Sequence, residues 1–283
     1  MTRIVYVNGD FVPFEEARIP IMDRGFLFAD GIYEVSAVVD GRLVDNEGHL
    51  ARLDRSLAEI RIPNPHATEE WVRLQTELVA RNGVTEGLVY MQVTRGVAER
   101  DFAFPKEARP TVVMFTQAKT ILASPLAETG VAVVSVPDLR WTRRDIKSVA
   151  LLAQVLAKQA AADAGVFEAW MVEDGAVTEG SSSTAFIVTR DGTIVTRPLS
   201  NAILPGITRR AVMRLAEEVQ LRVEERAFTI EEAHDAAEAF LTSASSFVMP
   251  VVAIDGRPVG DGRPGPLARR LRALYVEMAR GEA

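Results

Sequence analysis

The chain has 283 residues, 48% hydrophobic and 25% charged, and this length suits one large core or two medium ones. Its net charge of −7 argues against general nucleic-acid binding, which depends on clustered cations that neutralise phosphates. The absence of cysteine excludes disulfides, iron–sulfur clusters and thiolate zinc sites. No apolar run approaches the ~20 residues that a membrane helix needs. We therefore expect a cytoplasmic protein that acts on small molecules, without membrane or nucleic-acid partners.

Two hairpins and two helices are predicted in the first third of the chain. Apolar strand patterns flank Asn-Gly-Asp at 8–10 and Asp-Gly at 40–41, which indicates hairpins and hence an antiparallel sheet. Amphipathic patterns begin at Asn46 and Thr68, so two helices should cover one face of that sheet. Two more strands are expected on either side of an arginine-bearing loop at 95–109, and loops of this length are often functional.

A second domain is predicted after a weak linker pattern at 120–126, because the strand pattern restarts at Val131. Residues 1–119 should form a small N-terminal domain, and residues 127–283 a larger C-terminal domain. Strands and helices are mixed without regular β-α-β alternation, which is typical of α+β domains. Each domain should be an antiparallel-rich sheet or barrel with helices. Helices of the second domain are expected at 149–164, directly after Gly206, and at 267–280.

Lys147 is the first candidate for chemistry. It lies between a predicted strand and the long helix, next to Arg143 and Arg144. Cationic neighbours and partial burial favour a neutral amine, which is the form that attacks an aldehyde. A lysine in this position is more commonly an ordinary surface residue, so its role depends on other parts of the sequence.

Two other sequence patterns can be interpreted either as part of a binding site or as simple turns. VTEGSSST places Glu179 at the end of a predicted hairpin strand, and a carboxylate is what a pyridinium nitrogen needs to stay protonated. In LPGITR, a turn at Gly206 leads into a helix whose free N–H groups can hold a phosphate. Each pattern alone is more often a simple turn, with a solvated glutamate in the first case.

Together and in this order, the patterns resemble the fold-type IV enzymes that depend on pyridoxal 5'-phosphate (PLP). This class contains D-amino acid transaminases, branched-chain transaminases and aminodeoxychorismate lyases. The resemblance covers nearly the whole chain, and DIKS at 145–148 with VLAKQ at 155–159 is close to bacterial D-amino acid transaminases. The matching segments are DRGFLFADGIYEV at 23–35, Arg52, 140–158, TEGSSS at 178–183, LPGITR at 204–209 and TSASS at 242–246.

The resemblance implies how the cofactor is held. Lys147 matches the lysine that binds PLP as a Schiff base and moves protons, and Glu179 matches the partner of the pyridine nitrogen. Arg52 matches the arginine that binds the cofactor phosphate. Ala244 departs from the pattern, since relatives often have threonine there and a hydroxyl contact is lost. The other implied cofactor contacts are Ser183, Leu204, Gly206, Ile207, Thr208 and Ser243, together with Ala244.

The resemblance also implies a site for the substrate carboxylate. Tyr33 and Arg100 match two residues of the typical carboxylate trap, in which the arginine comes from the partner subunit of a homodimer. Phe102 stands where a histidine is typical, and Ala37 stands where a lysine is frequent. The pocket should therefore be more apolar, which could admit aromatic substrates or (R)-amines. Val35 is a further implied substrate contact, and Arg95 or Arg143 could assist Arg100.

The implied function is transfer of an amino group between a D-amino acid and a 2-oxo acid by a ping-pong mechanism, with (R)-amines as a further substrate class. The alternatives are a branched-chain L-amino acid transaminase, an aminodeoxychorismate lyase and a PLP-binding protein without activity. A homodimer with its active site at the subunit interface is expected. No metal site is expected, because His49, His66 and His234 show no ligand spacing.

Overall fold

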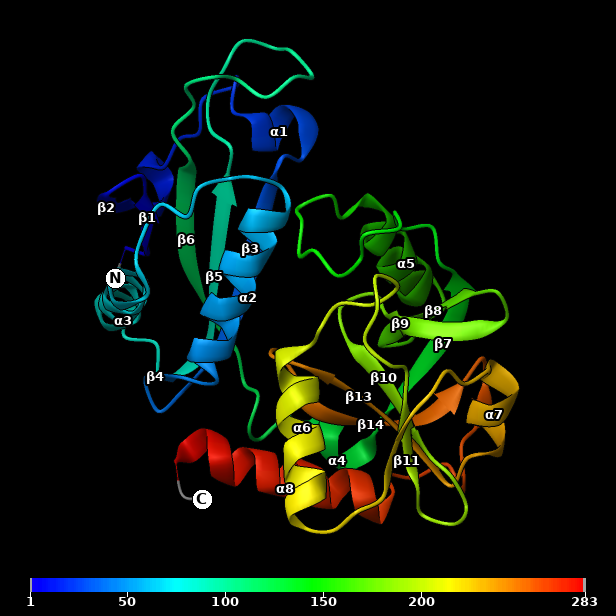
Figure 1. Ribbon diagram of the computed structural model, residues 1–283. Coiled ribbons are helices and arrows are strands. Elements are labelled where there is room, and N and C mark those ends of the chain that lie inside the picture. Colours follow the sequence, from blue (N-terminus) through cyan, green and yellow to red (C-terminus); the bar gives the residue numbers. More distant parts are fainter. Residues whose placement is uncertain (1, 282–283) are drawn as a thin grey trace. The chain divides into compact units, whose positions relative to one another are not determined.

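The computed structural model describes residues 2–281, and the chain divides into two compact units (Figure 1). Unit 1 contains Met1–Thr120 and Ile146–Ala150, and unit 2 contains Ile121–Asp145 and Leu151–Ala283. The predicted division into 1–119, a linker at 120–126 and 127–283 stays a prediction. It differs from the two units in two respects. Ile146–Ala150 groups with unit 1, and the predicted linker is not separate, because Thr120 belongs to unit 1 and residues 121–126 belong to unit 2.

Unit 1 is built on a six-stranded antiparallel sheet, counted over residues 2–281, with the order β2-β1-β6-β5-β3-β4 (Figure 1). β3 and β5 are its long central pair, in register from Gly31 opposite Thr94 to Val39 opposite Glu86. Its strands are β1 (Ile4–Val7), β2 (Asp10–Pro13), β3 (Gly31–Val39), β4 (Arg42–Leu43), β5 (Glu86–Thr94) and β6 (Thr111–Ala118). Its helices are η1 (Phe14–Glu16), α1 (Arg24–Phe28), α2 (Asn46–Glu59) and α3 (Thr68–Asn82).

The core of unit 1 lies between the sheet and helices α2 and α3. Alternate residues of β5 point to one face, because side chains of a strand repeat every two residues. The helices bury residues three and four apart, the spacing of a single helix face. The predicted starts of α2 and α3 are confirmed. Fully buried contributors are Leu53, Leu57, Trp71, Leu74, Leu78, Val89, Met91 and Val93.

Unit 2 contains a mixed sheet of nine strands within the described part of the chain, ordered β12-β11-β10-β13-β14-β7-β8-β9, with β15 paired to β14. The β14–β7, β7–β8 and β11–β12 pairs are parallel, and the other pairs are antiparallel. The strands are β7 (Val131–Pro137), β8 (Glu168–Glu173), β9 (Ala176–Gly180), β10 (Thr184–Val188), β11 (Ile194–Thr196), β12 (Val223–Glu225), β13 (Glu238–Ser243), β14 (Phe247–Ile254) and β15 (Arg257–Pro258). The helices are α4 (Pro125–Thr129), α5 (Leu152–Asp163), α6 (Ile207–Glu218), α7 (Ile230–Asp235) and α8 (Pro266–Arg280).

Both faces of the unit 2 sheet are buried. In β8, Trp170 packs into the main core with Phe228, whereas its neighbours Ala169 and Met171 pack under α5. This alternation follows from the two-residue repeat of a strand. Helices α6 and α8 pack together and contact β13, and α8 also contacts β14 (Figure 1). The buried positions of the sheet therefore have helices or a second apolar layer on each side.

The observed units are α+β, as predicted, and the short elements are where the sequence was least informative. Helix α5 starts at Leu152 and not at Val149, because Val149 donates its backbone N–H to Gly31 O of β3 at 3.0 Å. Helix α4 begins inside the predicted linker. A capping box formed by Thr229 and Glu232 begins α7. No helix among the described residues is both long and apolar enough to cross a membrane.

Candidate active site

The backbone of Lys147 is held along one edge of β3, within unit 1. Tyr33 N–H donates to Lys147 O at 3.0 Å, and Ile32 forms an isolated bridge with Ser148. On the other side, Lys147 N–H contacts Ser56 Oγ of α2 at 3.5 Å. The segment after the predicted linker thus returns to the first sheet, and it fixes the position from which the lysine side chain extends.

The Lys147 amine lies over the face of the Tyr33 ring, with Nζ 4.1 Å from the ring centroid. Tyr33 stacks on Tyr90 at 5.7 Å, and Tyr90 stacks on Phe115 at 4.7 Å. Burial raises the pKa of Tyr90, and its hydroxyl donates to Gln92 Oε1 at 2.8 Å. A predicted covalent lysine and a predicted substrate residue therefore meet, on a platform of stacked rings that holds Tyr33 in place.

Arg52, the predicted phosphate ligand, is fixed from the opposite side of β3. Its Nε and Nη2 contact the two carboxylate oxygens of Glu34 at 2.7 and 2.9 Å, and Glu34 is 0% exposed. His49 Nδ1 lies 2.8 Å from Glu34 Oε2. Burial alone would raise the pKa of Glu34, but Arg52 and His49 hold it well below its usual range. The bidentate contact uses two of the five guanidinium donors and sets the plane of the group.

Arg100 and Phe102 lie on the long loop between β5 and β6, and both side chains lie near Phe28 of α1. The Arg100 guanidinium carbon is 5.3 Å from the Phe28 ring centroid and 5.5 Å from that of Phe102. The two rings are 5.4 Å apart, and Phe102 is 77% exposed. Arg24 holds this loop by donating to Asp101 O at 2.6 Å. Phe28 and Phe102 thus pack near the Arg100 guanidinium, and Phe102 is the residue that stands where the resemblance implies a histidine.

The other arginines suggested for the carboxylate are already engaged. Arg95 is buried, forms two contacts with Asp30 at 2.8 and 2.9 Å, and donates to two backbone carbonyls of the segment after α2. Burial alone would raise the pKa of Asp30, but Arg95 and Arg24 lower it. Arg143 pairs with Asp145 at 3.0 Å. Arg100 therefore remains the better candidate for the carboxylate.

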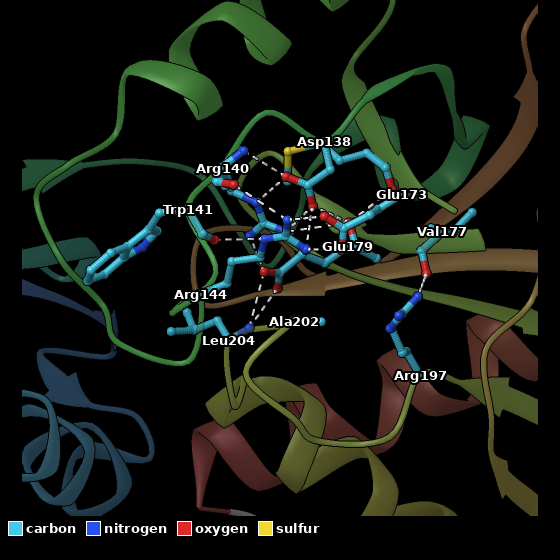
Figure 2. Close-up of polar contacts among 12 residues, drawn as sticks. Asp138, Arg140, Trp141, Arg144, Glu173, Val177, Glu179, Arg197, Ala202 and Leu204 are labelled. Atoms are coloured by element: carbon cyan, nitrogen blue, oxygen red, sulfur yellow. Dashed lines mark hydrogen bonds and ion pairs between the residues drawn. The ribbon is translucent and has the colours of Figure 1, made fainter. Parts of the chain in front are cut away.

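Glu179 is the last residue but one of β9 in unit 2, and it is 5% exposed (Figure 2). Its carboxylate forms an ion pair with Arg140 and accepts the Leu204 backbone N–H at 3.1 and 3.3 Å. Burial raises the pKa of Glu179, and the contacts with Arg140 and Leu204 act in the opposite direction. Glu179 and Leu204, two of the predicted cofactor residues, are thus in contact, whereas the sequence did not indicate a role for Arg140.

Glu168 of β8 organises the serine turn after Glu179. It is buried, and its carboxylate accepts hydrogen bonds from the hydroxyls of Ser181, Ser182 and Ser183. A Cβ on Gly180 would lie 2.1 Å from Ser183 Oγ, so a side chain there would require the serine hydroxyl to move. No local pattern signals the role of Glu168, since its partners follow 13 to 15 residues later and meet it only through the pairing of β8 with β9.

The predicted phosphate-binding residues gather near the ends of β10 and β13. Thr184 of β10 pairs with Thr242 of β13, and a Cβ on Gly206 would lie 2.8 Å from Thr184 Oγ1. Helix α6 begins one residue after Gly206, so its first N–H groups belong to Ile207 and Thr208. Strand β13 ends with Ser243, whose hydroxyl lies 2.7 Å from that of Ser246.

The predicted site residues are distributed over both units. Within unit 1 the structure brings Lys147 to Tyr33 and Arg100 to Phe102. Within unit 2 it brings Glu179 to Leu204 and gathers the residues near Thr184. The unit 1 set is Tyr33, Val35, Arg52, Arg100, Phe102 and Lys147, and the unit 2 set is Glu179, Ser183, Leu204, Gly206, Ile207, Thr208, Ser243 and Ala244.

The profile of the family described as amino-transferase class IV matches residues 31–254. The chain is 41% identical over 277 residues to a D-alanine aminotransferase of Staphylococcus aureus (strain MSSA476), covering 96% of this chain and 98% of the relative. It is 40% identical over 270 residues to a D-alanine aminotransferase of Bacillus licheniformis, covering 95% and 94%. A solved T.th. branched-chain amino acid aminotransferase with pyridoxamine 5'-phosphate superimposes with a TM-score of 0.92 at 27% identity, covering 100% of this chain and 96% of that one.

The chain belongs to the class IV aminotransferases, and it is a PLP-dependent aminotransferase of the fold-type IV class.

The residues present fit that cofactor. A buried carboxylate such as Glu179 suits the protonated nitrogen of a pyridine ring. The lack of a side chain at Gly206 lets Thr184 Oγ1 lie close to the start of α6, and helix N-termini favour phosphate. Thr242 Oγ1 is buried with no hydrogen-bond partner among residues 2–281, so a donor remains beside Ser243. Over the same residues, no group of three or more His, Cys, Asp or Glu side chains is arranged for a metal ion.

The buried pair of Glu34 and His49 predicts an acid-sensitive fold. Burial lowers the pKa of His49 below 6.5, so the folded chain binds fewer protons than the unfolded chain near that pH. Stability should therefore be complete above about pH 6.5 and fall as the pH drops, by up to about 1.4 kcal/mol per pH unit. The depressed pKa of Glu34 adds a further loss as the pH drops below about 4.3.

Urea unfolding of the apoprotein between pH 8 and pH 5 measures the first effect. His49→Gln should reduce the slope of the profile above about pH 5, and the remaining slope should come from His66, whose pKa is also lowered by burial. A wild-type profile that is already flat between pH 7 and pH 5.5 would contradict the assignment.

Proposed function

We propose that this aminotransferase moves amino groups between D-amino acids and 2-oxo acids. The observation that carries the proposal is the 41% identity, over nearly the full length of both chains, to a D-alanine aminotransferase. The solved branched-chain enzyme shares the fold at 27% identity, so it supports the branched-chain alternative less strongly. Amino acids and 2-oxo acids are the expected substrates of either enzyme.

We assign to Lys147 the covalent attachment of the cofactor and the movement of the proton at the substrate Cα. PLP supplies an aldehyde that takes up the amino group and a ring that stores the electron pair of the broken Cα–H bond. The stacked ring of Tyr33 supports Nζ from one side, and the pairing with β3 holds the backbone. Nζ is therefore held in a defined place for proton transfer, as general acid–base catalysis requires.

The resemblance supplies the assignments for the rest of the cofactor. Glu179 is assigned to the pyridine nitrogen and Leu204 to the face of the ring. Arg52 is assigned to the phosphate, because Glu34 already fixes its guanidinium plane. The remaining phosphate contacts are assigned to Ser183, Gly206, Ile207, Thr208, Ser243 and Ala244, of which Ile207 and Thr208 contribute the N–H groups at the start of α6.

The substrate carboxylate is assigned to Arg100 with Tyr33, and the side chain is assigned to a pocket that includes Val35 and Phe102. An arginine suits a carboxylate because its fork forms two parallel hydrogen bonds. Phe102 and Phe28 flank this arginine, which favours apolar substrates beside the guanidinium. Simple (R)-amines are a further proposed substrate class.

The proposed assembly is a homodimer with its active site at the subunit interface. One face of α5 supports it, because Leu152, Val155 and Leu156 are exposed there and lie three and four residues apart. Isolated exposed apolar residues are ordinary, but an apolar stripe on one helix face marks a surface that favours association. The cytoplasmic location and the absence of membrane and nucleic-acid partners stay proposals drawn from the sequence.

Addition of D-alanine to the purified holoenzyme, without an acceptor, should convert the bound cofactor to its aminated form. The absorption spectrum follows this change directly. Lys147→Ala should abolish it, and Lys119→Ala, directly after β6, should not. Conversion by L-leucine and not by D-alanine would favour the branched-chain enzyme instead. Release of pyruvate from aminodeoxychorismate without an acceptor would indicate the lyase.

Arg100→Ala should raise the KM for D-alanine by about 10- to 100-fold, since a hydrogen bond to a charged group contributes about 1.5–3 kcal/mol. The kinetics with (R)-1-phenylethylamine, which has no carboxylate, should change much less. Steady-state assays of both substrates measure the difference, with Arg109→Ala on the same loop as the matched control. Equal losses with both substrates would place the carboxylate elsewhere.

A further inference from the structure

Glu179 is the last member of a row of five alternating charges in unit 2 (Figure 2). Glu173 pairs with Arg144, Arg144 Nη1 lies 3.4 Å from Asp138 Oδ2, and Arg140 Nη2 lies 2.7 Å from the same oxygen. Arg140 then pairs with Glu179 through Nη1. Four of the five side chains are buried, and only that of Glu173 reaches the surface, with 38% exposed. The row therefore connects a solvent-accessible carboxylate to a buried one.

Asp138 fixes the guanidinium of Arg140. It accepts hydrogen bonds from Arg140 Nε at 3.0 Å, from Nη2 at 2.7 Å and from the Arg140 backbone N–H at 3.1 Å. The Thr178 hydroxyl donates to Asp138 at 2.6 Å, which ties the pair to β9 next to Glu179. Burial alone would raise the pKa of Asp138, but Arg140 and Thr178 lower it. With two of its nitrogens held in this way, Arg140 directs the third to Glu179.

The two carboxylate oxygens of Glu179 accept different numbers of hydrogen bonds. Oε1 contacts Arg140 and the Leu204 N–H at 3.1 Å, whereas Oε2 receives the Leu204 N–H at 3.3 Å as its only hydrogen bond within residues 2–281. Each carboxylate oxygen has two lone-pair sites. Oε2 is therefore the oxygen with capacity for a further N–H donor.

We propose that Arg140 is a positioning residue of this enzyme, which holds Glu179 Oε1 so that Oε2 faces the pyridine nitrogen as an ionised acceptor. This inference rests on the proposed role of Glu179. One proton is shared between Oε2 and the ring nitrogen, and Arg140 decides which of the two carries it. Arg140 touches Glu179 directly, and a ring nitrogen bound at Oε2 would lie on the far side of that carboxylate, so Arg140 would stabilise the carboxylate more than it repels the pyridinium.

Asp138 completes the charge balance of the site. Asp138, Arg140 and Glu179 together carry a single negative charge, which matches the single positive charge of a protonated pyridine ring. Without Arg140, the charge of Asp138 would still repel the Glu179 carboxylate and raise its pKa. The shared proton should then move to Glu179, since burial already disfavours its charged form.

The test is the 15N chemical shift of cofactor labelled at the ring nitrogen and bound to the full-length enzyme. The wild type should show the shift of a protonated pyridine. Arg140→Met should move it most of the way to the value of a neutral pyridine and slow a single turnover by about 10- to 100-fold. Arg140→Lys keeps the charge without the planar fork and should give an intermediate shift.

Arg197→Met is the matched control. Arg197 donates to Val177 O of the same strand at 3.2 Å without touching Glu179, so its replacement should leave the shift unchanged (Figure 2). An unchanged shift in Arg140→Met overturns the inference, as does weaker cofactor binding with an unchanged shift, which indicates a merely structural role. If Arg140→Met does not fold, a wild-type shift in Arg140→Lys overturns it equally.

The failure of the proposed function is distinguishable from these results. A neutral pyridine in the wild type, or a protonated one in Glu179→Gln, removes the assigned role of Glu179 and with it this inference. A protonated ring in the wild type that becomes neutral in Glu179→Gln but not in Arg140→Met overturns only the role of Arg140.

Discussion

The pairing of residues 147–149 with the edge of β3 is the constraint on which the site depends. Two backbone hydrogen bonds of 3.0 Å join this segment to Gly31 and Tyr33, and they carry it from unit 2 of the chain back to unit 1. A lysine on an unattached connection would lose about 1–2 kcal/mol of backbone entropy for each residue ordered on binding. Here that ordering occurs during folding, so Nζ lies over Tyr33 in the folded protein.

Buried charges fix the other groups that are assigned to the cofactor. In unit 1, Glu34 orients Arg52, and in unit 2, Asp138 orients Arg140, which in turn holds Glu179. A buried ion pair adds little net stability, but removal of one partner costs about 3–5 kcal/mol because the other charge is left uncompensated. Such pairs therefore orient side chains more than they stabilise the fold, and a site with defined geometry requires oriented side chains.

Local patterns in the sequence predicted the elements that depend on local physics. Helices α2 and α3 follow from apolar residues three and four apart, so their starts at Asn46 and Thr68 could be predicted. The five-residue helix α1 escaped prediction because it is too short to show a period. The start of α5 was misplaced because Val149 takes a partner in β3, which lies far earlier in the chain.

The candidate residues followed from resemblance, but their supporting partners did not. Glu34 lies 18 residues before Arg52, and Arg140 lies 39 residues before Glu179, so each pair forms only after the strands have been placed. Arg95 looked suitable for a substrate carboxylate, yet it is buried against Asp30, which no local pattern signals. The sequence identified the residue types that perform the chemistry. Tertiary contacts determine which of the charged side chains are available to bind the substrate or the cofactor.

The central claim is that Lys147 is the residue that holds the cofactor. Reduction of the holoenzyme with sodium borohydride makes that bond permanent, and proteolysis with mass spectrometry then locates it. The account predicts a phosphopyridoxyl group on the peptide that contains Lys147. The other three lysines, Lys106, Lys119 and Lys158, should be unmodified. A group on any of those three, or none on Lys147, would contradict the account.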